Sequence, residues 1–300
     1  MVYHIYHNTQ FSYQQWVSFS HNLVRLKPRN TPVQTVVDFS LSVDPAATET
    51  DEYNDYFGNH LHHLLVREPH ALLNVIAKSC VAIDKEAIEA LDIRRELSLS
   101  LSVEEAMKRL SYRTPESIDA KQYTLRSPLL VPASEGLEAY ARLSFHPERS
   151  LYLSIQEFMG RIFEDFKFVP GFSNLSTPVD EVFEAKKGVC QDFAHLAITA
   201  LRSLGLPTRY MSGYIETIPP KGEDKLFGSD ASHAWFSVYL PELGWFDFDP
   251  TNNIVPRDQH ILLGFGRDYS DISPIQGVVQ GSGLSHLNVM VDVSREEVKE

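Results

Sequence analysis

The stretch GVCQDFAHLAITALRSLGLP, residues 188–207, decides the fold of the C-terminal half of this chain. Apolar residues recur at helical spacing from Phe193 to Leu204, and a glycine and a proline follow them as helix-end signals. Cys190 therefore falls in the first turn of an amphipathic helix, beside backbone N–H groups that lack an intrahelical acceptor. This position favours a thiolate and offers donors to an oxyanion, so Cys190 is a candidate nucleophile.

A free cysteine is also often a small buried apolar residue, so Cys190 alone leaves both interpretations open. Two downstream motifs bear on the choice: SHAW at 232–235 and DFDPTNN at 247–253. Both lie in strand-like segments, which predicts a hairpin that carries an imidazole and a carboxylate. His233 could equally be a strand histidine bonded to a backbone carbonyl, and the aspartate before Pro250 could be a turn or N-cap carboxylate.

The loop between the two strands decides which aspartate can reach His233. A three-residue loop at 241–243 places Trp235 opposite Asp249, so that His233 and Asp249 become diagonal neighbours about 7–8 Å apart at Cα. Asp247 then lies about two residues farther from His233 and is expected to be a supporting group. The predicted triad is Cys190 as nucleophile, His233 as base and Asp249 as the group that orients the ring.

Together these motifs resemble the core of bacterial transglutaminase-like proteins, which belong to the papain-like group of cysteine enzymes. The matching segments are GVCQDFAH (188–195), RSLGLPTRYMSGY (202–214), SHAW (232–235) and GWFDFDPTNN (244–253). Shorter matches to the accompanying β-rich N-terminal region are LVRLKPR (23–29) and DYFGN (55–59), and GRDY (266–269) fits the family's tail. The family's catalytic cysteine, histidine and aspartate fall on Cys190, His233 and Asp249.

The resemblance and the hydrophobic patterns together predict an α+β fold. Residues 1–83 are expected to form an antiparallel β-sandwich, and residues 84–149 a mainly helical connecting region. Residues 150–300 are expected to form the papain-like or transglutaminase-like catalytic domain, including the C-terminal strands. Its cysteine-bearing helix should pack on an antiparallel sheet that carries the histidine and the aspartate.

Four further residues are weaker candidates for the site, as oxyanion donors or supporting groups. Gln191 could contribute its backbone N–H, Tyr214 could line the cleft, and Trp235 and Asp247 could support the histidine and the aspartate. Core packing is an equal alternative for Tyr214 and the favoured one for Trp235. His195, one turn after the cysteine, is expected on a solvated face of the helix.

The predicted function is acyl transfer at amide bonds of a peptide or protein substrate, through a thioester on the cysteine and without a cofactor. Hydrolysis is favoured slightly over transfer to an amine. The alternative from another class is an inactive transglutaminase-like binding or scaffold protein, because a fold does not guarantee activity.

Composition narrows the possible partners and the compartment. The formal charge of −13 argues against nucleic acid, and no apolar stretch approaches the ~20 residues that span a bilayer, so no membrane is expected. The chain has only two cysteines and no signal-peptide pattern near its start, which predicts a cytoplasmic protein. Metal is not expected either: the histidines at 60–63 lack a carboxylate or cysteine at ligand spacing, and no calcium-loop motif occurs.

Overall fold

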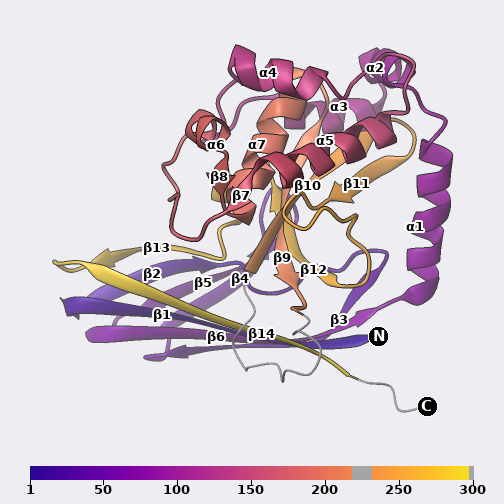
Figure 1. The fold of residues 1–300 in the computed structure, drawn as a ribbon. Helices are drawn as coiled ribbons and strands as arrows, with labels where there is room; N and C mark the ends of the chain where they lie inside the picture. Colours follow the sequence, from indigo (N-terminus) through magenta and orange to yellow (C-terminus); the bar gives the residue numbers. More distant parts are fainter. Residues whose placement is uncertain (218–231, 297–300) are drawn as a thin grey trace, which may run out of the picture.

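The computed structural model describes residues 1–217 and 232–296, which form a β-sandwich covered by a third sheet and a layer of helices (Figure 1). The first sheet has the order β14–β1–β6–β3, with strands Ser285–Arg295, Val2–Val17, His70–Ile83 and Gln34–Asp44. The second has the order β13–β2–β5–β4, with strands Ile275–Gln280, Phe19–Val24, His60–Val66 and Glu49–Asn54. All these neighbours are antiparallel, so the predicted antiparallel sandwich is confirmed.

One face of the first sheet serves two hydrophobic cores. Side chains of a strand alternate between faces, so every second residue of β6 points the same way. Along that face Val75 and Ala77 pack with Leu64 of the second sheet, whereas Val81 and Ile83 pack with residues of the third sheet. The long strands of the first sheet therefore continue past the sandwich and support the C-terminal core.

The third sheet, which we call the core sheet, has the order β11–β10–β9–β12. Its antiparallel strands are Gly244–Phe248, Ser232–Leu240, Thr208–Ile215 and His260–Gly266. Helix α7, Cys190–Ser203, packs on its two middle strands, as the resemblance predicts. The other helices are α1 Lys85–Ser98, α2 Val103–Ser111, α3 Pro115–Lys121, α4 Glu135–Arg142, α5 Leu151–Asp165, α6 Val179–Ala185 and α8 Tyr269–Ile272. A 3₁₀ turn, Gln122–Thr124, and the two-residue parallel pair β7, Lys167–Phe168, and β8, Lys187–Gly188, complete the chain.

Local sequence explains where the helices of the connecting region begin. Asp84, Ser102, Thr114 and Ser134 each accept a backbone N–H of the helix that follows, in α1 to α4 respectively. Such N-caps satisfy donors that the first turn leaves unpaired and typically contribute about 1 kcal/mol each. Local N-cap residues therefore help to determine where the helices between the sandwich and α5 begin.

The tail of the chain returns to the sandwich. The expected catalytic domain at 150–300 included the C-terminal strands, yet β13 pairs with β2 and β14 with β1. The two ends of the chain thus share the same sheets, which periodicity could not indicate because it does not name a strand's neighbour. Figure 1 shows both yellow tail strands lying along the indigo and violet strands of the N-terminal region.

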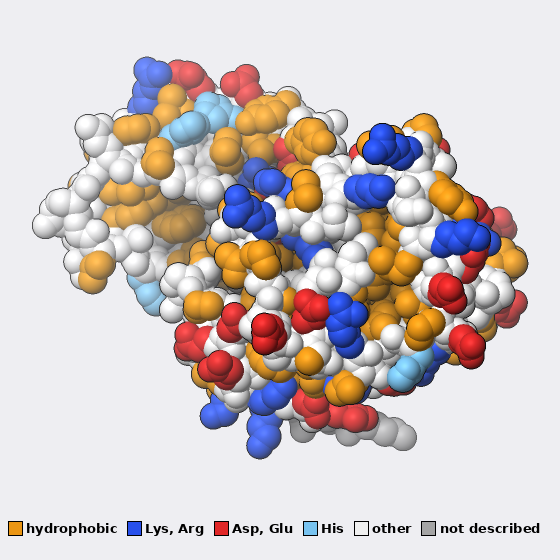
Figure 2. Space-filling model, turned by 90° about the horizontal axis from the view of Figure 1, so that it is seen from above, with side chains coloured by type: hydrophobic (Ala, Val, Ile, Leu, Met, Phe, Trp, Pro, Cys, Tyr) orange, Lys and Arg blue, Asp and Glu red, His pale blue; other side chains and the backbone are white. Residues whose placement is uncertain are grey.

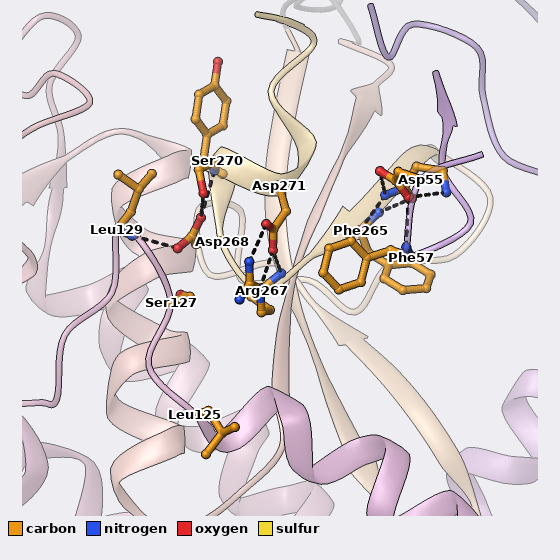
Figure 3. Close-up of polar contacts among 12 residues, drawn as sticks. Asp55, Phe57, Leu125, Ser127, Leu129, Phe265, Arg267, Asp268, Ser270 and Asp271 are labelled. Carbon is orange, nitrogen blue, oxygen red and sulfur yellow. Dashed lines mark hydrogen bonds and ion pairs between the residues drawn. The ribbon is translucent and has the colours of Figure 1, made fainter. Parts of the chain in front are cut away.

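A polar cluster in the GRDY motif fixes the point where the tail leaves the core sheet (Figure 3). Asp268 accepts the backbone N–H of Leu129 at 2.8 Å and that of Ser270 at 2.8 Å, which ties the tail to the connecting region. Arg267 and Asp271 form a two-bond ion pair at 2.8 and 2.9 Å. This motif therefore carries a structural role that the sequence match did not specify.

Candidate active site

Cys190 is the first residue of α7, and the residues before it leave little freedom in how the chain enters the helix. The buried carboxylate of Asp192 accepts the backbone N–H of Val189 at 2.7 Å and the hydroxyl of Ser173. A Cβ on Gly188 would lie 2.8 Å from the Cβ of Asp192, closer than real contacts allow. The Gly-Val-Cys order and the aspartate two residues later thus position the thiol at the positive end of the helix.

His233 reaches the site from β10, and the hairpin has the predicted register. Leu240 pairs with Gly244 and Ser237 with Asp247, so the three-residue loop is confirmed. His233 Nε2 lies 2.7 Å from Oδ2 of Asp249, and both side chains are buried. The ring also hydrogen-bonds the side chain of Cys190. The structure therefore brings the three predicted residues together in one hydrogen-bonded series.

Asp249 combines the two roles that its sequence context offered. Its Oδ1 accepts the backbone N–H groups of Thr251 at 3.0 Å and Asn252 at 3.3 Å, as a turn carboxylate does. Its Oδ2 accepts from His233 and from the side-chain amide of Asn252, the latter at 2.7 Å. A second imidazole, His260 Nε2, lies 3.0 Å from the same oxygen. The carboxylate is thus fixed by the turn on one oxygen and by side chains on the other.

These contacts set the protonation of the site. Burial alone would raise the pKa of Asp249, but hydrogen bonds from His233 and His260 outweigh it and hold that pKa well below its usual range. Burial alone would lower the pKa of His233, yet hydrogen bonds to Asp249 and Cys190 raise it to about 10. A protonated His233 at neutral pH favours the thiolate form of its partner.

Two residues of the site, Asn252 and His260, were not identified from the sequence. Asn252 lies within the DFDPTNN motif, three residues after the aspartate, where an amide in a turn is a usable signal. His260 lies on β12, which is separated from β10 by β9, so no local pattern places it near Asp249. Its ring lies 5.1 Å from that of Trp235, centroid to centroid.

The weaker candidates lie at different distances from this series. Gln191 is in the first turn of α7, where backbone N–H groups lack intrahelical acceptors. Trp235 stacks on His233 with ring centroids 6.0 Å apart and donates its Nε1–H to Asp247 Oδ2 at 3.1 Å. Tyr214 points the other way: its hydroxyl is 2.9 Å from His7 Nδ1 in the first sheet, because alternation along β9 turns it toward the sandwich.

His195 is not on a solvated face, contrary to the expectation. It is only 6% exposed, and its Nε2 accepts the backbone N–H of Tyr269 at 3.2 Å. Helix α8 and the tail cover this side of α7, a contact that the period of the helix could not indicate. Burial lowers the pKa of His195 to about 4.

One group of side chains in the described residues has spacing suitable for a metal ion. His233, Asp249 and His260 place one ligand atom each within 4.8 Å of one another. Both imidazoles hydrogen-bond Oδ2 of Asp249 through Nε2, so the atoms that come together here already bond one another.

Two family models match the chain in the order of its two halves. The bacterial transglutaminase-like N-terminal region matches residues 3–82, and the transglutaminase-like superfamily matches residues 140–250. Uncharacterized proteins of Mycobacterium tuberculosis and Mycobacterium bovis are 34% identical over 305 residues, covering 97% of this chain and 92% of theirs. The chain belongs to the transglutaminase-like superfamily.

Other similarities are more distant or partial. A protein-glutamine gamma-glutamyltransferase of Pseudomonas aeruginosa is 28% identical over 117 residues, covering 36% of this chain and 18% of that protein. The crystal structure of a provisionally assigned cysteine protease from Cytophaga hutchinsonii superposes with a TM-score of 0.76. It covers 100% of this chain and 92% of that one at 21% identity, so it supports the transglutaminase-like fold.

The helices of the described residues include none with the length and apolar character needed to cross a bilayer.

Proposed function

We propose that this transglutaminase-like protein is a cysteine-dependent acyl-transfer enzyme that acts on amide bonds of peptides or proteins. The observation that supports this proposal is the hydrogen-bonded series from the half-buried thiol of Cys190 through the buried side chains of His233 and Asp249. A buried carboxylate beside an imidazole whose pKa is raised to about 10 is the electrostatic setting in which a neighbouring thiol acts as a thiolate.

The reaction follows from the roles of these groups. Because Nε2 of His233 bonds Asp249, its Nδ1 is the nitrogen available to the thiol and to the leaving group. The thiolate of Cys190 adds to the amide carbonyl, and first-turn N–H groups of α7, including that of Gln191, stabilise the oxyanion. The C–N bond then breaks as His233 gives its proton to the leaving amine, which leaves a thioester on Cys190.

Water completes the cycle in this proposal. His233, now neutral, removes a proton from water as the oxygen adds to the thioester carbonyl, and the C–S bond breaks to release a carboxylic acid and the thiolate. An amine in place of water would give transamidation through the same intermediate. The substrate is a peptide or protein with an accessible amide.

On the face seen in Figure 2, basic side chains are scattered among acidic and apolar ones, so this face offers a nucleic acid no continuous basic patch.

The decisive experiment compares the wild type with Cys190→Ala on a blocked glutamine dipeptide, with ammonia release as the readout and intact mass of the protein in parallel. We expect ammonia release and an acyl adduct on wild-type protein only. Adding methylamine distinguishes the two acceptors, because transfer yields the methylamide and hydrolysis yields glutamate.

The scaffold alternative makes the opposite prediction for the thiol. Iodoacetamide that alkylates Cys190 no faster than a surface thiol, together with no effect of His233→Ala on that rate, would show that the series is structural. The protein would then be a binding member of the superfamily.

We also propose that the protein works in the cytoplasm, because both of its cysteines are unpaired. Fractionation of cells that express the chain with a C-terminal tag tests this.

A further inference from the structure

A cavity lies on the face of the core sheet that points away from helix α7. It has a volume of about 470 Å³ and is enclosed by α1, the outer face of the core sheet and the loop before β12. Trp235 and His260 form part of its wall, and both also contact the triad residues described above. Neither Cys190 nor His233 lines this cavity, so it is separate from the site of the proposed reaction.

The cavity is cationic in a protein that is strongly anionic overall. Arg94, Arg95, Arg209 and Arg257 line it, against the carboxylates of Asp92 and Asp247. Arg257 is paired with Asp92 at 2.6 Å. Arg94 donates to the backbone carbonyls of Leu243 and Trp245, and none of the other three guanidinium groups forms an ion pair within the part of the chain that the structure describes. Unpaired cations in a partly enclosed apolar space favour an anionic ligand.

Arg209 is the group whose bonding is least complete. Its guanidinium lies between two aromatic rings, 4.2 Å from the centroid of Trp245 and 3.8 Å from that of Phe265. Its Nε is buried and has no hydrogen-bond partner among the described residues. Burial lowers the pKa of this guanidinium to about 10, which leaves it charged at neutral pH. Leaving a charged donor unpaired in a buried position is costly, and an anion in the cavity removes that cost.

His260 supplies a second unpaired polar atom in the same wall. Its side chain is 2% exposed, and Nε2 is bonded to Asp249. Its Nδ1 is buried and has no hydrogen-bond partner among the described residues. In the tautomer whose Nε2 donates to the carboxylate, Nδ1 is an acceptor for an O–H or N–H of a ligand.

We infer that this cavity binds a small organic carboxylate that carries an aromatic or branched apolar body and one hydrogen-bond donor, such as a hydroxy acid. The carboxylate is held by the guanidinium of Arg209, the apolar body lies against Trp245 and Phe246, and the donor pairs with His260 Nδ1. A ligand there would touch the imidazole of His260, which hydrogen-bonds Asp249. Binding in the cavity is therefore coupled to the position of the Asp249 carboxylate. This inference does not depend on the proposed function.

The test uses phenyllactate and phenyllactamide as probes, titrated into full-length protein by calorimetry. The two probes differ in the carboxylate alone. We expect phenyllactate to bind at one site per chain and the amide to bind about tenfold more weakly or worse, since a charge-assisted hydrogen bond is lost. Phenylpropionate, which lacks the hydroxyl, should bind severalfold more weakly than phenyllactate.

Variants locate the site. Arg209→Met should weaken phenyllactate binding about tenfold and leave phenyllactamide binding unchanged, whereas the matched surface variant Arg113→Met should change neither. Leu91→Trp, which fills the cavity from α1, should weaken both probes. If Arg209→Met does not fold, as judged by circular dichroism, Arg95→Met takes its place, because Arg95 lines the same cavity from α1.

Three results would overturn the inference: equal affinity of the charged and neutral probes for the wild type, unchanged affinity in a folded arginine variant, or no heat of binding with phenyllactate at about 10 mM. Cys190→Ala protein should bind phenyllactate as the wild type does. A wild type that binds the probe but shows no acyl transfer would thus refute the proposed function and not this inference.

Discussion

Two histidines in the same core, His233 and His195, show how the surroundings of a buried ring decide its chemistry. Both are less than a tenth exposed. His233 donates to a carboxylate and has its pKa raised to about 10, whereas His195 accepts a backbone N–H and has its pKa lowered to about 4. Burial acts on both in the same direction, so the carboxylate of Asp249 and the thiol make the difference.

The comparison extends along helix α7, which carries Cys190 in its first turn and His195 in its second. The first turn faces a charged, hydrogen-bonded series, while the next turn packs beneath the tail and against Tyr210, with ring centroids 5.0 Å apart. One short helix therefore joins a proposed reactive end to an inert one. Four predictions test this contrast, from the largest expected effect to the smallest.

The largest effect should come from Asp249→Asn. An asparagine can still accept the turn's backbone N–H groups, but it removes the charge that keeps His233 protonated and oriented. We expect kcat/KM to fall by about 10⁴ in the ammonia-release assay, the loss typical of a triad carboxylate replaced by an amide. The matched control is Asp247→Asn on strand β11, which ends just before Asp249; this change should cost tenfold at most. Equal losses in both variants would contradict the assignment of Asp249, and not Asp247, as the carboxylate of the triad.

The next effect concerns thiol reactivity at low pH. With His233 protonated up to about pH 10, Cys190 should remain reactive toward iodoacetamide at pH 6, and His233→Ala should slow that reaction about tenfold or more. Mass spectrometry after tryptic digestion separates Cys190 from Cys80, whose pKa burial and nearby carboxylates raise. Identical pH profiles of alkylation in the wild type and in His233→Ala would show that the His233 ring and the Cys190 thiol are not electrostatically coupled.

A third prediction concerns stability and reverses the sign between the two histidines. Because the folded pKa of His195 is about 4, the unfolded chain binds the proton first and stability falls between about pH 6.5 and pH 4. For His233 the folded pKa is the higher one, so its contribution is complete below about pH 6.5 and is lost as pH rises toward 10.

His195→Gln should therefore flatten the acid limb of the urea-unfolding free energy, by on the order of 3 kcal/mol between pH 6.5 and 4. The exposed His286→Gln variant is the control and should leave the slope as it is in the wild type. An acid limb unchanged in His195→Gln would mean that this ring is charged in the folded protein.

The smallest effect should come from the two groups that support Asp249 from the side. His260→Phe and Asn252→Ala each remove one hydrogen bond to Oδ2 and leave the contact with His233 in place. We expect kcat/KM to fall about tenfold in each, with Asp249→Asn masking both in double variants because the bonds share one acceptor. Additive losses would show that His260 and Asn252 act apart from the carboxylate.

Much of the site could be predicted because its geometry follows from short-range rules. Helical spacing placed Cys190 in a first turn, and strand alternation with a three-residue loop selected Asp249 over Asp247. Both arguments use residues fewer than twenty positions apart, where the backbone's fixed periods relate spacing to direction. The family resemblance then predicted that the helix of Cys190 packs on the hairpin, because neither helical spacing nor strand alternation indicates which elements contact each other.

The remaining contacts depend on which surfaces of the folded chain pack together, and local sequence patterns do not indicate this. Alternation puts Tyr214 on one face of β9, but only the packing of the sandwich against that face directs its hydroxyl to His7. His260 on β12 reaches Asp249, which follows β11, although β9 and β10 lie between these two strands in the sheet. Strands β13 and β14 pair with strands that lie more than 250 residues earlier in the sequence. His195 is buried because the tail folds over it. Sequence alone determined the helix that begins at Cys190 and the register of the hairpin. Tertiary structure decided the partners of Asp249 and the charge on each histidine, because burial and long-range contacts set the free energies of protonation.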